Sequence, residues 1–320
     1  MKIVVLDGHT LNPGDNPWTP VERLGDVVIY DATPPAEILN RCAGVPIVLT
    51  NKVPLNADTL EQLPELKLIA VTATGYNVVD VAAANESGVT VCNVPVYSTQ
   101  SVAQHVFAML LSFVHRVEAH HDAIGDDQWQ QRGQFSFWLT PISELTDKTF
   151  GVIGFGRIGQ ATARLAQAFG MKIMIHSRTK KDVAGFESAR WGSIENVVAE
   201  SDFISLHCPL TDSNQEFFNA DLIGTMKPSA ILINTARGGL VHEQDLADAL
   251  SKQQIRGACL DVLSSEPPAT DNPLLKAPHC LLTPHVAWTA IEARKRLMQI
   301  TADNVAAFLN GQPINVVKTS

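Results

Sequence analysis

The chain has few cysteines, no long uninterrupted apolar run and no excess of positive charge. The cysteines are scattered and form no Cys-x-x-Cys pair, which predicts buried free thiols in a reducing compartment and neither disulfides nor a metal site. The longest apolar stretch, 102–114, is broken by Gln104, His105 and Ser112, so no membrane span is expected. The net charge of −9 disfavours nucleic acid and anionic membranes as partners. The five cysteines are at positions 42, 92, 208, 259 and 280.

The rest of the composition is typical of a compact, water-soluble protein. Hydrophobic residues make up 45% and charged residues 18% of the 320 positions, and this length suits two domains. The first predicted strand begins at Lys2, which leaves no room for a signal peptide. We therefore expect a cytoplasmic protein.

Residues 1–92 alternate between short apolar runs and amphipathic stretches. This alternation predicts a parallel sheet covered by helices, with binding at the carboxyl ends of the strands. Thr33 and Asn56 are expected to cap two of the helices. The expected strands are 2–7, 26–30, 46–50, 67–72 and 89–92, and the expected helices are 34–42, 56–62 and 78–87.

The next segment combines a long helix with an aromatic-rich arm. From Ser98 to about Gly125, apolar residues recur at helical spacing, which predicts one helix that links the two domains. Residues 126–144 have little periodicity. Aromatic side chains outside a regular element suggest an arm that packs on another subunit. The aromatic residues of this arm are Trp129, Phe135, Phe137 and Trp138.

A second alternation begins at residue 149 and predicts another parallel sheet. A final helix, at about 290–310, follows the last strand and is expected to cross back to the first domain. The expected strands are 149–154, 172–177, 202–206, 229–234, 256–261 and 280–283.

This second sheet opens with a glycine-rich turn between a buried strand and a helix. The turn, Gly154-Phe155-Gly156-Arg157-Ile158-Gly159, matches G-x-G-x-x-G. Gly154 suits a tight turn, Gly156 lets the backbone approach a pyrophosphate, and Gly159 lets the helix pack on the strand. The helix N-terminus offers unpaired N–H groups to the phosphates. The turn therefore predicts a dinucleotide site.

Three polar residues follow later strands of the same sheet. Arg237 and Glu266 each come after a buried strand, and His285 follows the last one. Because the carboxyl ends of parallel strands share one edge, we expect all three beside the nicotinamide. Reduction of a 2-keto acid needs a cation on the carboxylate and carbonyl, an acid for the hydroxyl proton, and a carboxylate that orients this acid. These three residue types supply that set.

Four motifs, in this order, resemble those of the D-2-hydroxyacid dehydrogenase family. The glycerate dehydrogenase and hydroxypyruvate (glyoxylate) reductase branch is the most similar, through Thr50-Asn51-Lys52, Thr74-Gly75-Tyr76-Asn77 and His285-Val286-Ala287-Trp288. The resemblance implies two Rossmann-like α/β domains, each a parallel sheet with helices on both faces, and an active site in the cleft between them. The motifs are Gly-Phe-Gly-Arg-Ile-Gly at 154–159, Asn-Thr-Ala-Arg-Gly at 234–238, Asp-Val-x-x-x-Glu-Pro at 261–267 and Thr-Pro-His-x-x-Trp at 283–288.

The resemblance also implies roles for single residues. Arg237 would bind the substrate carboxylate and carbonyl. His285 would donate the proton in reduction, and Glu266 would hydrogen-bond to His285. The loop around Thr74 and Gly75 would bind the substrate carboxylate through backbone N–H groups.

Further implied roles concern the pocket and the assembly. Asp261 would meet the nicotinamide carboxamide. The long helix and the arm would build a homodimer, and Trp138 would reach a substrate pocket, its own or the partner's. Trp288 is expected to line that pocket. Lys52 is either a cation near the substrate or a solvated loop residue.

The resemblance implies a flavodoxin-like substrate-binding domain of residues 1–98 plus 288–320. A dinucleotide-binding Rossmann domain would span 99–287 and include the dimerisation helix and arm at about 99–145. Outside the glycine turn, the residues expected to contact the cofactor are Ser177, Arg178, Thr179, Lys180, His207, Cys208, Pro209, Thr235, Ala236, Asp261 and Ala287.

The end of the second strand of this domain bears on the choice between NAD and NADP. An NAD-selective site has an acidic residue there for the ribose hydroxyls. Here the strand runs into Ser177-Arg178-Thr179-Lys180-Lys181, which offers a hydroxyl, a guanidinium and ammonium groups to a 2′-phosphate. NADP(H) is therefore favoured, and NAD(H) stays open.

The other histidines do not suggest a metal site. His105 and His115 are too far apart on the long helix to form a ligand pair, and the adjacent His120 and His121 point different ways. We therefore expect no metal, and His207 is expected to line the cofactor site.

Two alternative functions stay open at this point. One is another 2-hydroxyacid dehydrogenase of the same family, since the pocket around Tyr76, Trp138 and Trp288 sets the substrate. The other is a dinucleotide-sensing interaction protein on the same fold. Turnover of a 2-keto acid would separate them.

Overall fold

The computed structural model describes residues 1–181 and 183–318. The chain divides into two compact units, Met1–Ser98 with Trp288–Ser320 and Thr99–Ala287. The last two positions of the predicted 288–320 segment lie outside the described residues. Within the described ranges, no helix combines the length and apolar character needed to cross a membrane.

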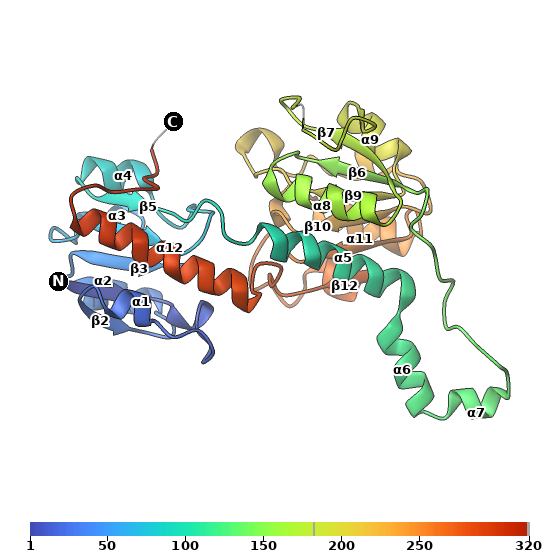
Figure 1. The fold of residues 1–320 in the computed structure, drawn as a ribbon, viewed down its shortest axis with the longest axis horizontal. Coiled ribbons are helices and arrows are strands. Elements are labelled where there is room, and N and C mark those ends of the chain that lie inside the picture. The colour runs from blue at the N-terminus through green and yellow to red at the C-terminus, as the bar shows by residue number, and fades with distance from the viewer. Residues whose placement is uncertain (182, 319–320) are drawn as a thin grey trace. The chain divides into compact units, whose positions relative to one another are not determined.

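The first unit contains a five-stranded parallel sheet in the order β2-β1-β3-β4-β5 (Figure 1). Its strands are short and rich in β-branched residues, which suits strands that are buried on both faces. The strands are β1 Lys2–Val5, β2 Asp26–Ile29, β3 Ile47–Thr50, β4 Leu68–Val71 and β5 Thr90–Cys92. The helices are α1 Thr19–Glu22, α2 Ile38–Cys42, α3 Ala57–Glu61, α4 Val81–Glu86 and α12 Ile291–Leu309, with 3-10 turns at Gly8–Thr10 and Pro35–Glu37.

Successive residues of β1, and Leu6 directly after it, enter two different cores of this unit. Ile3 and Val5 pack with Leu297 and Met298 of α12, whereas Val4 and Leu6 belong to the cluster on the opposite face. Because side chains alternate across a strand, helices must cover both faces of the sheet. The chain therefore returns through α12 to complete the first unit.

The second unit contains a seven-stranded parallel sheet in the order β12-β11-β10-β9-β6-β7-β8. The strands are β6 Thr149–Ile153, β7 Lys172–His176, β8 Arg190–Trp191, β9 Phe203–Leu206, β10 Ile231–Asn234, β11 Gly257–Leu260 and β12 Cys280–Leu282. The helices are α5 Thr99–His115, α6 Val117–Gly125, α7 Gln128–Arg132, α8 Arg157–Ala168, α9 Ile194–Glu200, α10 Ala220–Ile223 and α11 Glu243–Ser251, with 3-10 turns at Asp212–Asn214, Gly238–Leu240 and Pro273–Lys276.

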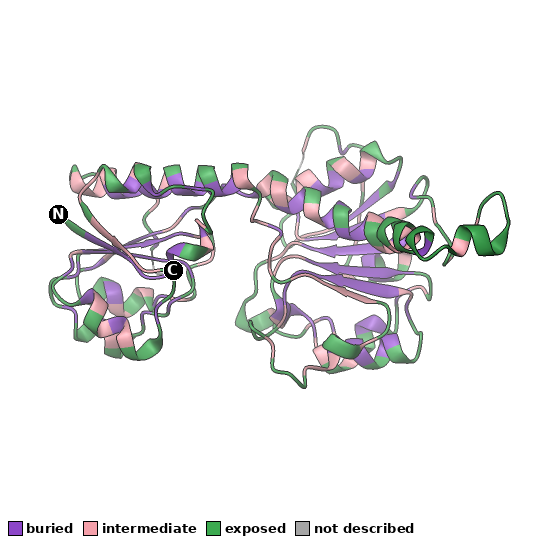
Figure 2. Ribbon diagram, turned by 90° about the horizontal axis from the view of Figure 1, so that it is seen from below, coloured by how far each residue is buried: buried purple, intermediate pink, exposed green. Residues whose placement is uncertain are grey.

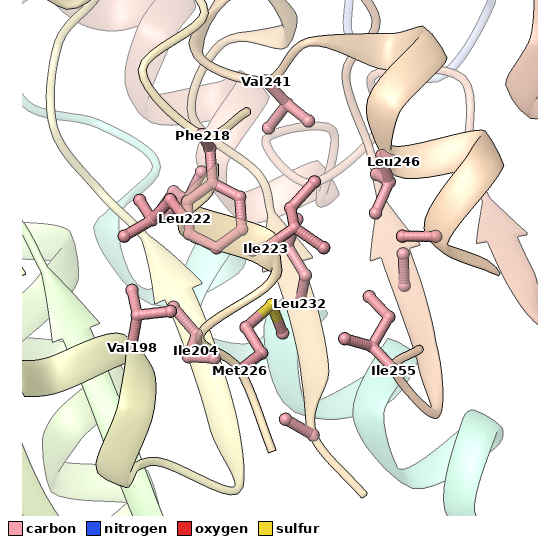
Figure 3. Close-up of a cluster of buried hydrophobic side chains, with 14 of the residues drawn as sticks. Val198, Ile204, Phe218, Leu222, Ile223, Met226, Leu232, Val241, Leu246 and Ile255 are labelled. Carbon is pink, nitrogen blue, oxygen red and sulfur yellow. The ribbon is translucent and has the colours of Figure 1, made fainter. Parts of the chain in front are cut away.

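This sheet is also buried on both faces (Figure 2). On one face Phe218, Leu232 and Leu246 belong to a cluster of buried apolar side chains from strands and covering helices (Figure 3). On the other face Phe150 and Ile233 pack against α5 and α8. The prediction of two parallel α/β sheets is confirmed.

Four details of the sequence-based prediction were wrong. The helix predicted from Ser98 to about Gly125 breaks into α5 and α6 at Arg116, whose φ of 50° is left-handed (Figure 1). The arm predicted to lack regular structure contains the short helix α7. Strand β8 was missed, since two residues carry no periodic signal. Thr33 is not a cap, because its hydroxyl donates to the Leu6 carbonyl, whereas Asn56 does cap α3.

Candidate active site

The glycine turn after β6 uses its three glycines in different ways. Gly154 has a φ of +99°, and a Cβ there would lie 2.5 Å from the Cys208 nitrogen. At Gly159 a Cβ would lie 2.2 Å from the Gly154 carbonyl oxygen, so only glycine allows this helix–strand contact. A Cβ on Gly156 would meet no atom within 4 Å, which leaves open space in front of the backbone at the start of α8.

Two further features fit a dinucleotide at this edge of the sheet. The twelve-residue helix α8 begins without a side-chain cap, so its first N–H groups are available to an anion. The Thr235 hydroxyl, directly after β10, is buried and has no hydrogen-bond partner within the described part of the chain. A buried polar atom normally has a partner, and a bound polar group would provide one.

The basic segment after β7 presents two exposed cations, Arg178 and Lys180, at the end of its strand. Burial raises the pKa of the Cys208 thiol, and the positive charge of Arg178 acts against that rise. The Lys180 ammonium lies 5.9 Å from the centre of the Trp191 ring. Arg178, Thr179 and Lys180 are exposed, and Ser177 is half-buried.

His207 is held as a neutral side chain beside the glycine turn. Burial lowers its pKa to about 3, and its Nε2 lies 2.9 Å from the Ser205 hydroxyl. Its backbone carbonyl packs against Gly154. This arrangement suits lining of a cofactor site, whereas a metal would need several converging ligands.

The three candidate catalytic residues come from loops after the adjacent strands β10, β11 and β12. Arg237 follows β10 and is exposed; it forms no ion pair with any residue that the structure describes. Gly238 lets the loops after β10 and β11 touch, because a Cβ there would lie 1.9 Å from the Leu263 carbonyl carbon. The Arg237 guanidinium donates to the Ala236 carbonyl at 2.7 Å, and the parallel sheet brings it to the edge that carries Glu266 and His285.

Glu266 and His285 form a direct pair. The distance from Glu266 Oε2 to His285 Nδ1 is 2.5 Å, and the two side chains are 32% and 24% exposed. A carboxylate accepts hydrogen bonds, so Nδ1 carries a proton and donates it to this bond. The Nε2 atom of His285 is then the ring nitrogen that can exchange a proton with a ligand.

The backbone at His285 adopts a conformation that side chains disfavour. Its φ of 55° is left-handed, which costs a non-glycine residue roughly 1–2 kcal/mol. Such conformations persist where neighbouring groups determine them and are typical of active sites. Here the His285 N–H donates to the Asp261 carbonyl at 2.8 Å.

The Asp261 carboxylate is occupied by this same loop. It is 1% exposed and accepts hydrogen bonds from the Thr283 hydroxyl and from the N–H groups of Val286 and Ala287. Its oxygens hold the loop that carries His285, and the contact of Asp261 with the nicotinamide carboxamide stays a prediction.

Sequence reasoning missed His105. The sequence assigned this residue to a linking helix and considered it only as a metal ligand. In the structure its Nε2 lies 3.1 Å from the Thr283 hydroxyl and 3.5 Å from Asp261 Oδ1. The two elements are separated by 178 residues in sequence, so no local pattern could indicate the contact.

Lys52 and the Thr74 loop belong to the first unit. Asp7, which is 6% exposed, accepts hydrogen bonds from three successive N–H groups, one of them that of Lys52 at 2.6 Å. Burial raises the pKa of Asp7, and these bonds oppose that rise. The Thr74 hydroxyl donates to the Val94 carbonyl, whereas the N–H groups of Thr74 and Gly75 have no protein acceptor among the described residues.

The two tryptophans assigned to the pocket lie in different surroundings. Trp138 is on the arm and 64% exposed. Trp288 packs edge-on against Tyr97 in the first unit, with ring centres 6.1 Å apart. Across the described residues, no three His, Cys, Asp or Glu side chains gather as they would around a metal ion.

Comparison with known proteins agrees with this geometry. The model of the D-isomer specific 2-hydroxyacid dehydrogenase NAD binding domain matches residues 107–287. A hydroxypyruvate reductase of Blautia hydrogenotrophica is 44% identical over 320 residues, and a glycerate dehydrogenase of Methylorubrum extorquens is 42% identical. Each alignment covers 99% of this chain and 99% of the relative.

One solved structure is similar over nearly its whole length. It is an NADPH-dependent glyoxylate/hydroxypyruvate reductase from Sinorhizobium meliloti in complex with NADP and malonate. It is 29% identical, with a TM-score of 0.84, and the match covers 99% of this chain and 96% of that one.

Proposed function

Because this chain belongs to the D-isomer-specific 2-hydroxyacid dehydrogenase family, we propose that it reduces hydroxypyruvate or glyoxylate to the D-2-hydroxy acid with NAD(P)H. The observation that carries this proposal is the 2.5 Å contact between Glu266 and His285. It joins an acid and its orienting carboxylate at the strand edge that also carries Arg237. The reaction is reversible, and glycerate or glycolate would be the product.

Each catalytic residue has a distinct task in the proposed reaction. Arg237 binds the substrate carboxylate and polarises the keto oxygen. His285 transfers the proton on Nε2 to that oxygen as it becomes a hydroxyl, and Glu266 stabilises the ring charge before the transfer. In this chemistry a bound reduced nicotinamide supplies the hydride to C2. One proton and one hydride therefore convert the keto acid into the hydroxy acid.

The residues around the glycine turn would hold that cofactor. Gly154, Gly156 and the first N–H groups of α8, at Arg157 to Gly159, would face the pyrophosphate. The unpartnered Thr235 hydroxyl supports a role beside the cofactor. Further lining would come from His207, Cys208, Pro209, Ala236, Asp261 and Ala287.

In the first unit, the loop at Thr74 and Gly75 would bind the substrate carboxylate. Its N–H groups without a protein acceptor, within the described chain, support this role. The hydrogen bond from the Lys52 N–H to Asp7 fixes the backbone at Lys52, which supports a role for this lysine as a second cation near the substrate. Trp138 and Trp288 would then set the size of the pocket.

We further propose that the protein prefers NADP(H) over NAD(H). The exposed Arg178 and Lys180, with Ser177 and Thr179, offer several donors to a 2′-phosphate. Arg178→Ala should raise the KM for NADPH at least about 10-fold and leave the KM for NADH nearly unchanged. Lys172→Ala, at the other end of β7, is the matched control. Equal effects of Arg178→Ala on both cofactors would contradict the preference.

The exposed aromatic residues of the arm support a homodimer. The free cysteines support a reducing compartment such as the cytoplasm. Phe135 is 96% exposed and Trp138 64% exposed, more than apolar side chains favour in a lone chain. All five cysteines are free thiols. Light scattering of wild type and of Phe135→Asp at several concentrations would test the dimer. An unchanged mass for the variant would argue against this use of the arm.

Initial rates of NADPH and NADH oxidation test the proposed function. The substrates are hydroxypyruvate, glyoxylate and pyruvate, each over a range of concentrations. We expect the highest kcat/KM with NADPH and either hydroxypyruvate or glyoxylate. Cofactor binding without turnover of any 2-keto acid would contradict the proposal and favour a dinucleotide sensor.

A further inference from the structure

The Asp261 carboxylate accepts several hydrogen bonds from the loop that carries His285. Asp261 Oδ1 accepts the Thr283 hydroxyl at 2.6 Å and the Val286 N–H at 2.8 Å, and Oδ2 accepts the Ala287 N–H at 2.9 Å. These acceptors are buried, so water does not replace a lost bond easily. The position of His285 therefore depends on the position of the Asp261 carboxylate.

Helix α5 also contacts this loop. The Ser101 hydroxyl donates to the Ala287 carbonyl at 2.6 Å. His105 lies four residues later, on the same face of the helix, and its Nε2 lies 3.1 Å from the Thr283 hydroxyl. One helical turn thus supplies two contacts, one at each end of the 283–287 loop.

The hydrogen bonds around Thr283 fix where the proton of His105 lies. A threonine hydroxyl has a single proton, and Asp261 Oδ1 at 2.6 Å takes it in preference to Met109 Sδ at 3.8 Å. The Thr283 oxygen can then only accept from the ring. His105 Nε2 therefore donates a hydrogen bond to Thr283, which in turn donates to Asp261.

We propose that His105 is a positioning residue for proton transfer by His285. It acts through Thr283 and Asp261, which hold the left-handed backbone at His285 in place. The inference deepens the proposed reduction of a 2-keto acid and rests on it for its kinetic test. It assigns a task to a histidine outside the four motifs of the family pattern.

A pair of substitutions separates positioning from mere packing. His105→Leu fills similar space without a donor, whereas His105→Gln keeps an N–H that can reach Thr283. We expect His105→Leu to lower kcat about 10-fold or more, since small displacements of a catalytic group are costly. The KM for NADPH should change by less than about 3-fold, and His105→Gln should recover most of kcat.

Gln104→Leu is the matched control. Gln104 is the exposed neighbour of His105 on α5, and its side chain forms no hydrogen bond with the described residues. It should keep the wild-type kcat. Equal losses of kcat in His105→Leu and His105→Gln, or none in either, would overturn the proposal.

Hydrogen exchange gives a readout that does not depend on turnover. In His105→Leu the amides of Val286 and Ala287 should exchange about 10-fold faster than in wild type, and in His105→Gln near the wild-type rate. Unchanged exchange in His105→Leu would overturn the proposal even if kcat falls. If wild type reduces no 2-keto acid, the proposed function fails, and exchange at these two amides alone decides the role of His105.

Discussion

The carboxyl edge of the seven-stranded sheet has a glycine end, after β6, and a histidine end, after β11 and β12, and the two are built for function by opposite means. After β6 the chain has glycines, which carry no side chain, so the backbone at Gly156 faces open space. The start of α8 has no side-chain cap. At the ends of β11 and β12 the chain carries polar side chains, and the loop at His285 is held by hydrogen bonds from side chains and backbone.

The difference follows from the chemistry of each end. A pyrophosphate is bound by N–H groups and a helix dipole, which any backbone can supply once Cβ atoms are absent. A proton must instead leave one nitrogen of one ring in a fixed direction. The glycine end therefore needs open space in front of its backbone N–H groups, whereas the histidine end needs a loop that holds the imidazole ring in one position.

The first test of this comparison weakens the interaction between Glu266 and the His285 ring that donates the proton. Glu266→Gln keeps the shape of the side chain but removes its charge beside His285. We expect kcat for reduction to fall about 100-fold. The decline of the rate with rising pH should also move to lower pH, because an amide stabilises the imidazolium less than a carboxylate. A pH profile identical to that of wild type would contradict the role of Glu266.

Two alanine substitutions test the glycine end. Gly156→Ala adds a Cβ in open space, so the protein should keep its Tm while the Kd for NADPH rises about 10-fold. Gly154→Ala forces a φ of +99° on alanine and brings its Cβ to 2.5 Å from the Cys208 nitrogen. It should lower Tm by several degrees, at about 2–4 °C per kcal/mol. The same Tm for both variants would contradict the distinction between the open space at Gly156 and the crowded, left-handed backbone at Gly154.

The smallest expected effect is the acid dependence of Asp261. Burial acts to raise its pKa, but hydrogen bonds from His105, Thr283 and two N–H groups outweigh burial, so the pKa is lowered. A lowered folded-state pKa stabilises the fold above the unfolded value of about 3.9, and this contribution is lost as the pH falls through the folded value.

Asp261→Asn should therefore lower Tm at pH 7 by a few degrees. The difference from wild type should shrink as the pH falls from about 5 to about 2. Thermal unfolding at a series of pH values measures it. A Tm difference that stays constant over this pH range would show that the charge of Asp261 does not contribute to the stability of the fold.

The same contrast explains what the sequence could predict. The glycine turn leaves a local pattern, and polar residues after buried strands predict a shared edge, so the grouping of Arg237, Glu266 and His285 at that edge could be predicted from their positions. Each of these signals lies within a few residues of the chain.

The features that were missed depend on distant contacts or on backbone angles. The proposed role of His105 depends on its contact with Thr283, which is far away in sequence. Arg116 breaks a helix at a position with neither glycine nor proline, where the apolar periodicity continues. Thr33 resembles a cap, but its hydroxyl bonds to the Leu6 carbonyl. Periodicity and capping rules do not contain this information.

One measurement tests the central claim most directly, the single-turnover oxidation of bound NADPH by hydroxypyruvate and by glyoxylate in wild type and in His285→Gln. The account predicts that the substitution slows this step about 1,000-fold with either keto acid, while the Kd for NADPH changes by less than about 3-fold. A variant that still oxidises NADPH near the wild-type rate would contradict the assignment of His285 as the proton donor.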